Sequence, residues 1–218
     1  MVAYSSPSPP APKRKIQIVP TQGGTAEEVC ERCGYPWDFT PDGRHVIYAQ
    51  RAQEGSGPWA YLLDTSTRIR TPLIKSEAWQ TNFSPDGHWV VFGQGAGHVS
   101  KLFVAPLEGE AEIFEKQWIP LNDGHSWDDK PRWSLDGNLV YFTSDRGDGF
   151  VCLWAQRLDP TSKSPKGPPF SIYHRHQTRC SLSNAGYYNL ELSVASDKIV
   201  FSMAELTGNI WMTKLNLK

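Results

Sequence analysis

The sequence predicts an all-β fold of short antiparallel strands, and three observations lead to this prediction. Aromatic residues make up 12% of the 218 residues, a share typical of strand-rich chains. The chain also contains 18 glycines and 17 prolines, which punctuate strands with tight turns. Finally, an aromatic residue, a turn and a dense apolar run recur in that order along the chain. A unit that recurs in this way predicts a repeat architecture.

Four segments align as copies of this unit. They begin near residues 37, 80, 130 and 189, and their anchor residues lie 44, 50 and 59 residues apart. The anchors are Phe39, Phe83, Trp133 and Leu192. A propeller blade of four antiparallel strands requires a period of about 40–50 residues. The first two intervals fit this period and the third carries an insertion. The repeat therefore predicts an antiparallel β-propeller with about four blades in residues 15–218.

A tight turn follows each anchor. Proline presets φ, aspartate caps its own backbone and glycine accepts a positive φ. The turns are Pro41-Asp42-Gly43, Pro85-Asp86-Gly87, Asp136-Gly137 and Ala195-Ser196-Asp197. The apolar run after each turn does not alternate with polar residues. We therefore expect the second strand of each blade to be covered on both faces by neighbouring blades.

Third and fourth strands are expected after each second strand. The third strands are predicted at residues 59–63, 101–107, 151–158 and 209–215. The fourth strands, at residues 68–73, 112–121 and 170–173, are weaker, as outer edge strands are. Residues 1–14 are rich in proline and serine, and we predict a flexible tether there.

The two ends of the chain are predicted to fall within blades. Residues 15–23 match residues 101–109 with lysine, proline and glycine in register, so residues 15–34 form half a blade with a third and a fourth strand. Residues 209–215 form a third strand without a successor. The total is one strand more than four blades contain. Either a four-bladed ring closes with a spare strand, or the chain is part of a larger ring. A spare strand exposes a hydrogen-bonding edge, so we favour the larger ring.

The repeated motifs resemble those of TolB-type, WD-repeat-like β-propellers. The resemblance is carried by Phe83-Ser84-Pro85-Asp86-Gly87, by the segment from Thr143 to Gly147 and by Leu153-Trp154-Ala155, and it covers residues 15–218. It implies a bacterial protein whose ring has six or more blades. Some similar propellers are joined to serine/threonine kinase domains, and others precede the α/β-hydrolase domain of prolyl-oligopeptidase-like peptidases.

No catalytic motif accompanies the resemblance. A hydrolase requires a Gly-x-Ser-x-Gly nucleophile elbow, and Gly55-Ser56-Gly57 has the wrong spacing. We therefore predict a non-catalytic module that binds a protein or peptide on the connections between blades. The alternatives are a propeller lyase or hydrolase with active groups on channel loops, and a sensor fragment of a kinase-linked multidomain protein.

Two groups of residues are weak candidates for a site. Cys30 and Cys33 form a CxxC, which is half of a zinc site, and His174, His176 and Cys180 could supply the other ligands about one blade away. Structural thiols are the simpler interpretation, and we predict no metal and no cofactor. The second group, two acidic turns, could bind a ligand or Ca²⁺. Its residues are Trp127, Asp128, Asp129, Asp145 and Arg146.

Charge and hydropathy exclude other partners. The net charge is −1 and the one basic cluster, Lys13-Arg14-Lys15, closes the Pro/Ser-rich stretch, so we expect no nucleic acid. No apolar window reaches the ~20 residues that span a bilayer. The N-terminus lacks the apolar core of a secretory signal. As given, the chain is expected in the cytoplasm; as a fragment of a longer protein it could lie outside it.

Overall fold

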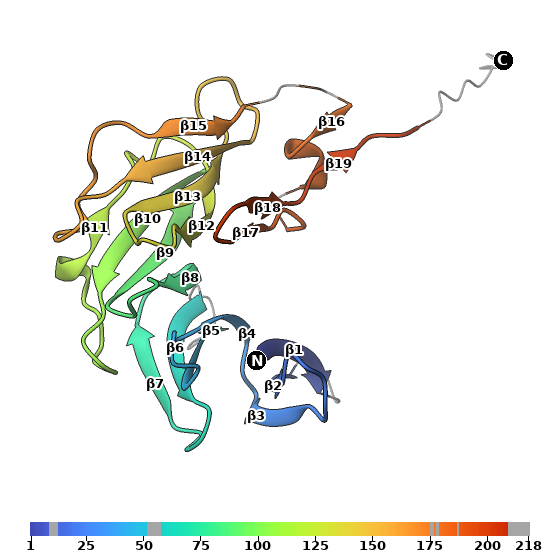
Figure 1. Ribbon diagram of the computed structural model, residues 1–218, viewed down its shortest axis with the longest axis vertical. Helices are drawn as coiled ribbons and strands as arrows, with labels where there is room; N and C mark the ends of the chain where they lie inside the picture. Colours follow the sequence, from blue (N-terminus) through green and yellow to red (C-terminus); the bar gives the residue numbers. More distant parts are fainter. Residues whose placement is uncertain (9–12, 52–57, 175–176, 178, 187, 209–218) are drawn as a thin grey trace, which may run out of the picture.

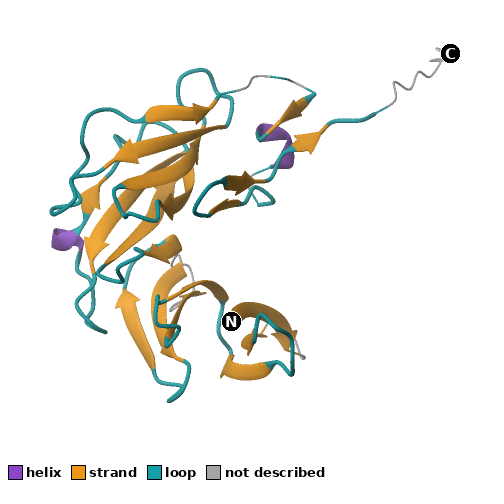
Figure 2. Ribbon diagram, viewed as in Figure 1, coloured by secondary structure: helices purple, strands orange, loops and turns teal. Residues whose placement is uncertain are grey.

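The computed structural model describes residues 1–8, 13–51, 58–174, 177, 179–186 and 188–208. These residues form 19 strands and two short 3₁₀ helices, η1 (Glu115–Gln117) and η2 (Ser183–Ala185). The strands belong to small antiparallel sheets that follow one another around an arc (Figures 1 and 2). The all-β antiparallel prediction is therefore confirmed. Within the described ranges, no helix has the length and apolar character to cross a membrane.

Three of the sheets have four strands each and correspond to complete blades. Blade 1 contains β4 (Tyr35–Phe39), β5 (His45–Arg51), β6 (Pro58–Asp64) and β7 (Arg70–Ile74); blade 2 contains β8 (Trp79–Phe83), β9 (Trp89–Ala96), β10 (Val99–Pro106) and β11 (Ile119–Pro120); blade 3 contains β12 (Asp128–Trp133), β13 (Leu139–Ser144), β14 (Cys152–Arg157) and β15 (Phe170–Tyr173). The first strands β4, β8 and β12 contact one another in succession, so they are the inner strands of the arc (Figure 1).

The second strands of blades 1 and 2 are packed between sheets. In β9, Val90 and Phe92 belong to the cluster shared with blade 1, whereas Val91 belongs to the cluster shared with blade 3. All three side chains are fully buried. The same holds for the run that opens β5, where Ile47 faces blade 2 and Val46 faces the N-terminal sheet. For β5 and β9 this confirms that an apolar run without alternation is covered on both faces.

The turn between first and second strands is the same in all three complete blades. In blade 3, the backbone N–H of Asn138 donates to Asp136 Oδ1 at 3.1 Å, and that of Leu139 donates to Ser134 Oγ at 2.9 Å. Equivalent bonds join Asp42 and Asp86 to their own turns. The hydrogen bond from Ser134, together with that from Asn138, holds the pKa of Asp136 below its ordinary value. An exposed leucine thus replaces proline in blade 3 without altering the turn.

The N-terminal residues do not form the predicted tether. β1 (Val2–Ser8) pairs antiparallel with β2 (Lys13–Val19), from Val2–Val19 to Ser8–Lys13. β2 pairs in turn with β3 (Glu27–Glu31), as the predicted third and fourth strands of a half blade. The composition of this segment suggested disorder, but Ala3 packs against the core beneath β2. Proline at position 7 is tolerated because β1 is an edge strand.

The C-terminal unit is smaller than a blade in the described residues. β17 (Leu192–Val194) and β18 (Ile199–Phe201) form a hairpin in the positions of a first and a second strand. A separate pair, β16 (Cys180–Ser181) with β19 (Ala204–Glu205), was not expected from the sequence. The predicted strand at residues 209–215 lies outside the described residues.

Replacing Asp136 by asparagine should destabilise the protein at neutral pH but not in acid. The turn lowers the pKa of the Asp136 carboxyl group in the folded protein below the ~3.9 of an unfolded chain. The ionised carboxylate therefore stabilises the folded state fully above pH ~3.9, and this stabilisation is lost as the pH falls through the pKa of the folded protein. The urea concentration at the midpoint of unfolding should be lower for D136N than for the parent at pH 7, and this difference should shrink towards pH ~3. Asp197→Asn, in the exposed fourth turn, is the control. A difference in midpoint that does not change with pH would contradict the view that the lowered pKa of Asp136 stabilises the fold.

Candidate binding site at the inner strands

A polar residue precedes the anchor of every inner strand and extends to the neighbouring blade. Three such links connect successive inner strands: Phe83 N donates to Asp38 Oδ2 at 2.9 Å, Asn82 Nδ2 donates to Pro131 O at 3.4 Å, and Arg132 Nη2 lies 3.6 Å from Glu191 Oε2. Burial raises the pKa of Asp38, while the N–H groups of Phe83 and Phe39 oppose that rise. The inside of the arc is therefore lined by polar groups that also join the blades.

All three inner strands of the complete blades carry a register shift, and in two of them, β8 and β12, the shift contains a residue with a left-handed backbone. The ladder shifts between Trp79 and Asn82 in β8 and between Asp129 and Arg132 in β12. Within these bulges Gln80 and Lys130 have φ of 52° and 54°. A left-handed backbone costs a non-glycine residue about 1–2 kcal/mol, and such strain gathers at functional sites. Both side chains line the two neighbouring pockets described next.

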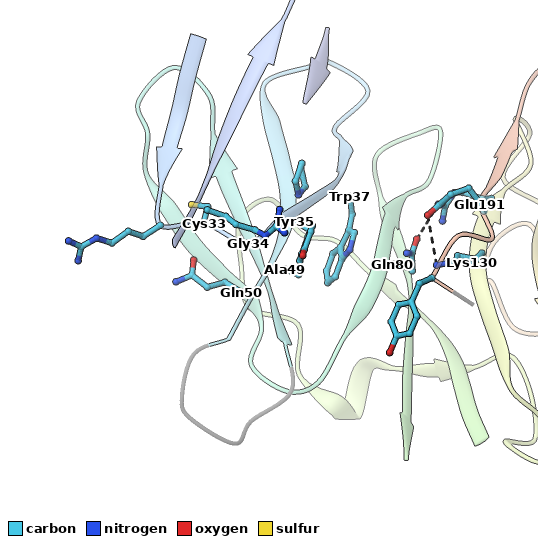
Figure 3. Close-up of a pocket in the computed structure, with 14 residues that line it drawn as sticks. Cys33, Gly34, Tyr35, Trp37, Ala49, Gln50, Gln80, Lys130 and Glu191 are labelled. Atoms are coloured by element: carbon cyan, nitrogen blue, oxygen red, sulfur yellow. Dashed lines mark hydrogen bonds and ion pairs between the residues drawn. The ribbon is translucent and has the colours of Figure 1, made fainter. Parts of the chain in front are cut away.

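The first of these, the inner pocket, has a volume of about 940 Å³. It extends from the N-terminal sheet across the inner strands β4 and β8 to β12 and the segment before the C-terminal hairpin (Figure 3). Its charged residues are Arg14, Arg32, Lys130, Arg132 and Glu191. Four cationic groups therefore face one carboxylate. Arg132 donates to Gln80 Oε1 at 3.1 Å and to Pro131 O at 2.8 Å.

Lys130 is nearly buried but has no close partner. Its side chain is 7% exposed, and its Nζ lies 3.7 Å from Asp129 Oδ2. The same Nζ lies 3.9 Å from Glu191 Oε1 (Figure 3). Both separations exceed hydrogen-bonding distance. Within the described ranges, no residue accepts a hydrogen bond from this ammonium. Because burial of an ion costs several kcal/mol unless hydrogen bonds compensate it, a ligand that supplies acceptor oxygens would stabilise Lys130.

The second pocket, the aromatic pocket, has a volume of about 650 Å³ and shares Gln80 and Lys130 with the first. Its wall contains Trp79 and Trp127, whose rings are stacked with centroids 5.7 Å apart and an interplanar angle of 15°. Trp79 lies flat on β9, where a Cβ at Gly95 would come within 2.7 Å of its ring and a Cβ at Gly93 would overlap it. These glycines therefore make room for the tryptophan.

Three of the five residues of the predicted acidic turns line the aromatic pocket. Trp127, Asp129 and Asp145 line the aromatic pocket, and Trp127 N donates to Asp145 Oδ1 at 2.8 Å. Asp128 and Arg146 instead pair with each other at 2.6 Å, and Asp128 is fully buried. These two residues hold blade 3 together and do not line the aromatic pocket.

The structure does not assemble the CxxC candidate as a metal site. Cys30 and Cys33 form a disulfide, and both are buried. A disulfide offers no thiolate, which is the form that binds zinc. His174 lies 3.9 Å from Asp148 on blade 3, and His176 lies outside the described residues. Cys180 is a free, half-buried cysteine.

One cluster of potential metal ligands exists in the described part of the chain: His45, Asp64 and Glu110. Arg44 Nε donates to Asp64 Oδ2 at 3.0 Å, and Ser66 N donates to Asp64 Oδ1 at 2.8 Å. The hydrogen bond from the Ser66 hydroxyl is the main cause that lowers the pKa of Asp64. Because the guanidinium already neutralises this carboxylate, the cluster is an ion-pair network.

The sequence had not indicated Gln80, Lys130, Arg132 or Glu191 as site residues. One signal was present, because each anchor is preceded by a polar residue: Asp38, Asn82, Arg132 and Glu191. The bulges at Gln80 and Lys130 have no such signal, since they depend on how the inner strands pair with β9 and β13.

No protein-family model matches the chain. Among solved structures, TolB from Acinetobacter baumannii matches with a TM-score of 0.66 and 21% identity, over 93% of this chain and 49% of that one. The fold is that of a TolB-like β-propeller. A putative TolB from Agrobacterium tumefaciens gives a TM-score of 0.60 at 20% identity, over 78% of this chain and 60% of that one.

The likeness extends to the propellers of peptidases. Prolyl oligopeptidase B from Galerina marginata matches with a TM-score of 0.60 at 12% identity, over 93% of this chain and 30% of that one. Identities this low show a common fold and nothing further. The chain spans about half the length of the Acinetobacter TolB.

Replacing Gly93 by alanine should displace Trp79 and open the aromatic pocket. The added Cβ would overlap the indole, and overpacking of this kind costs about 1–3 kcal/mol. Circular dichroism should show the exciton coupling of the stacked Trp79–Trp127 pair in the parent and its loss in G93A. Gly208→Ala, where a Cβ would meet no atom within 4 Å, is the control. Unchanged coupling in G93A would contradict this arrangement.

Proposed function

We propose that this TolB-like propeller is a non-catalytic module that binds a protein or peptide at its inner strands. The observation that carries the proposal is Lys130, a nearly buried ammonium without a hydrogen-bonded partner in the described residues, placed between two pockets. A binding site of this type combines an apolar surface with a few polar groups that fix orientation.

The pockets together favour a ligand with a carboxylate next to an apolar side chain. Lys130 lines both pockets and Arg132 lines the inner pocket, and a guanidinium can bind a carboxylate through two parallel hydrogen bonds. The stacked pair Trp79–Trp127 offers an aromatic surface beside them. The Gln80 amide can donate to a peptide carbonyl. An acidic and an aromatic or aliphatic residue, adjacent in an extended peptide, would satisfy all of these groups.

The non-catalytic part of the proposal rests on the sequence, which contains no Gly-x-Ser-x-Gly motif. The likeness to prolyl oligopeptidase B concerns the fold, and this chain covers 30% of that protein. Turnover of a peptide or glycoside panel by the purified chain would overturn this part and leave the binding part open to its own test.

The binding site is tested by peptide display on the full chain. Selected peptides should be enriched in a carboxylate beside an apolar residue. Lys130→Met should weaken their binding by about tenfold to a hundredfold, because hydrogen bonds to charged groups contribute about 1.5–3 kcal/mol.

Lys75→Met is the matched control for this experiment. Lys75 is half-exposed, pairs with Glu112 at 2.6 Å and lines neither pocket. Its substitution should leave peptide affinity unchanged. Peptides that bind K130M as tightly as the parent would contradict the assignment of the site.

A further inference from the structure

The N-terminal sheet has a vacant position where a blade has its inner strand. Residues 15–23, which include most of β2, match residues 101–109 of the third strand β10. The order of the sheet is β1-β2-β3. β1 therefore occupies the position of a second strand and β3 that of a fourth. In the described residues, no strand pairs with the other edge of β1.

The contacts between sheets support this assignment independently of the sequence. In the complete blades, each inner strand contacts the second and third strands of the preceding blade: β8 contacts β5 and β6, and β12 contacts β9 and β10. β4 contacts β1 and β2 in the same way. Inner strands also contact each other, as β4 with β8 and β8 with β12. Within the described residues, no inner strand lies beside β4 on the side of the N-terminal sheet.

The register of the N-terminal sheet shows which backbone groups face the vacancy. Arg14 O accepts a hydrogen bond from Cys33 N at 3.0 Å, so the backbone of Arg14 points towards β3. Its partner Pro7 therefore belongs to a non-hydrogen-bonded pair and points away from β2. Because backbone groups alternate in direction along a strand, the N–H and C=O groups of Ala3 and Ser5 also point away from β2. No described residue bonds to them.

We propose that an extended segment of a partner chain adds to this edge, antiparallel to β1, and completes the blade. Addition of a strand to an open edge is a common mode of peptide recognition, in which main-chain hydrogen bonds supply affinity. Edges without such a partner are a liability that proteins otherwise protect. The proposal concerns the backbone edge of β1, one end of which adjoins the inner pocket at Arg14 and Arg32, and it does not depend on the ligand of the pockets.

The surroundings of the edge define the chemistry of the partner segment. β1 begins beside Gly43, at the end of β4, and its other end lies near Tyr35, where the Arg14 guanidinium covers the Tyr35 ring at 4.3 Å. A segment antiparallel to β1 thus begins near Arg14 and Arg32, which have no ion pair within the described ranges. It should begin with an acidic residue. By analogy with Asn82-Phe83, it should end in a polar residue followed by an aromatic one.

The chain contains a suitable probe in its own inner strand β8. A labelled peptide that copies residues 77–84, from Glu77 to Ser84, begins with an acid and carries the polar–aromatic pair Asn82-Phe83 just before its last residue. Fluorescence polarisation with the full 218-residue chain should show saturable binding. Ser5→Pro removes an N–H that faces the vacancy and should weaken binding about tenfold or more. Ser5→Ala, which keeps that N–H, should bind like the parent.

Two N-methylated peptides keep the test decisive if S5P does not fold. Each carries N-methyl groups at alternate residues, so that one blocks the edge that faces β1 and the other blocks the opposite edge. One peptide should lose binding and the other retain it. Equal effects of the two peptides, or absence of saturable binding by the unmodified peptide, would overturn the proposal. If K130M loses binding and S5P retains it, the peptide binds in the pockets. This result would overturn strand addition and support the proposed function.

Discussion

The second strand of each blade is apolar on both faces, and this constraint determines the rest of the structure. A sheet with such a strand has no stable form in isolation, since one face would remain in water. In β9, Val91 packs towards blade 3 while Val90 and Phe92 pack towards blade 1. Each blade therefore requires a neighbour on both sides. The arc of sheets, and the placement of inner strands along one surface, follow from this requirement.

The same constraint distinguishes the two ends of the arc. In the C-terminal hairpin, Val200 of β18 is 59% exposed, whereas its counterparts in β5 and β9 are buried. In the N-terminal sheet, Lys15 pairs with Glu28 at 2.8 Å, and Ser6 donates to Gln17 at 2.9 Å. One end thus presents apolar surface suited to a further sheet, and the other presents polar groups and an open backbone edge.

The parts of the fold that the sequence predicted are those encoded by local chemistry and repetition. The Asp-Gly turns, the apolar runs after them and the strands β2 and β3 follow from residue types and spacing. β1 could not be predicted in this way, because its serine and proline content suggests disorder and only its pairing with β2 makes it a strand. The disulfide of Cys30 was also missed. A CxxC is compatible with a disulfide, a metal or free thiols, and the sequence does not choose among them.

The candidate site was predictable only in part. Trp127, Asp129 and Asp145 were recognised from the composition of their turns, and they do line the aromatic pocket. Lys130 was not, because its role depends on a bulge, and a bulge depends on the partner strand as much as on the strand that contains it. Backbone irregularities of this kind convert a regular inner strand into a binding surface.

Hydrogen exchange resolved by residue tests the central claim, that second strands packed on both faces hold the array together. The account predicts that the hydrogen-bonded amides of β5 and β9 exchange only through global unfolding, with a free energy equal to that from urea denaturation. Amides of the outer strands β7 and β15 should exchange through smaller local openings. Exchange of the β9 amides at the rate of those in β15 would contradict the account.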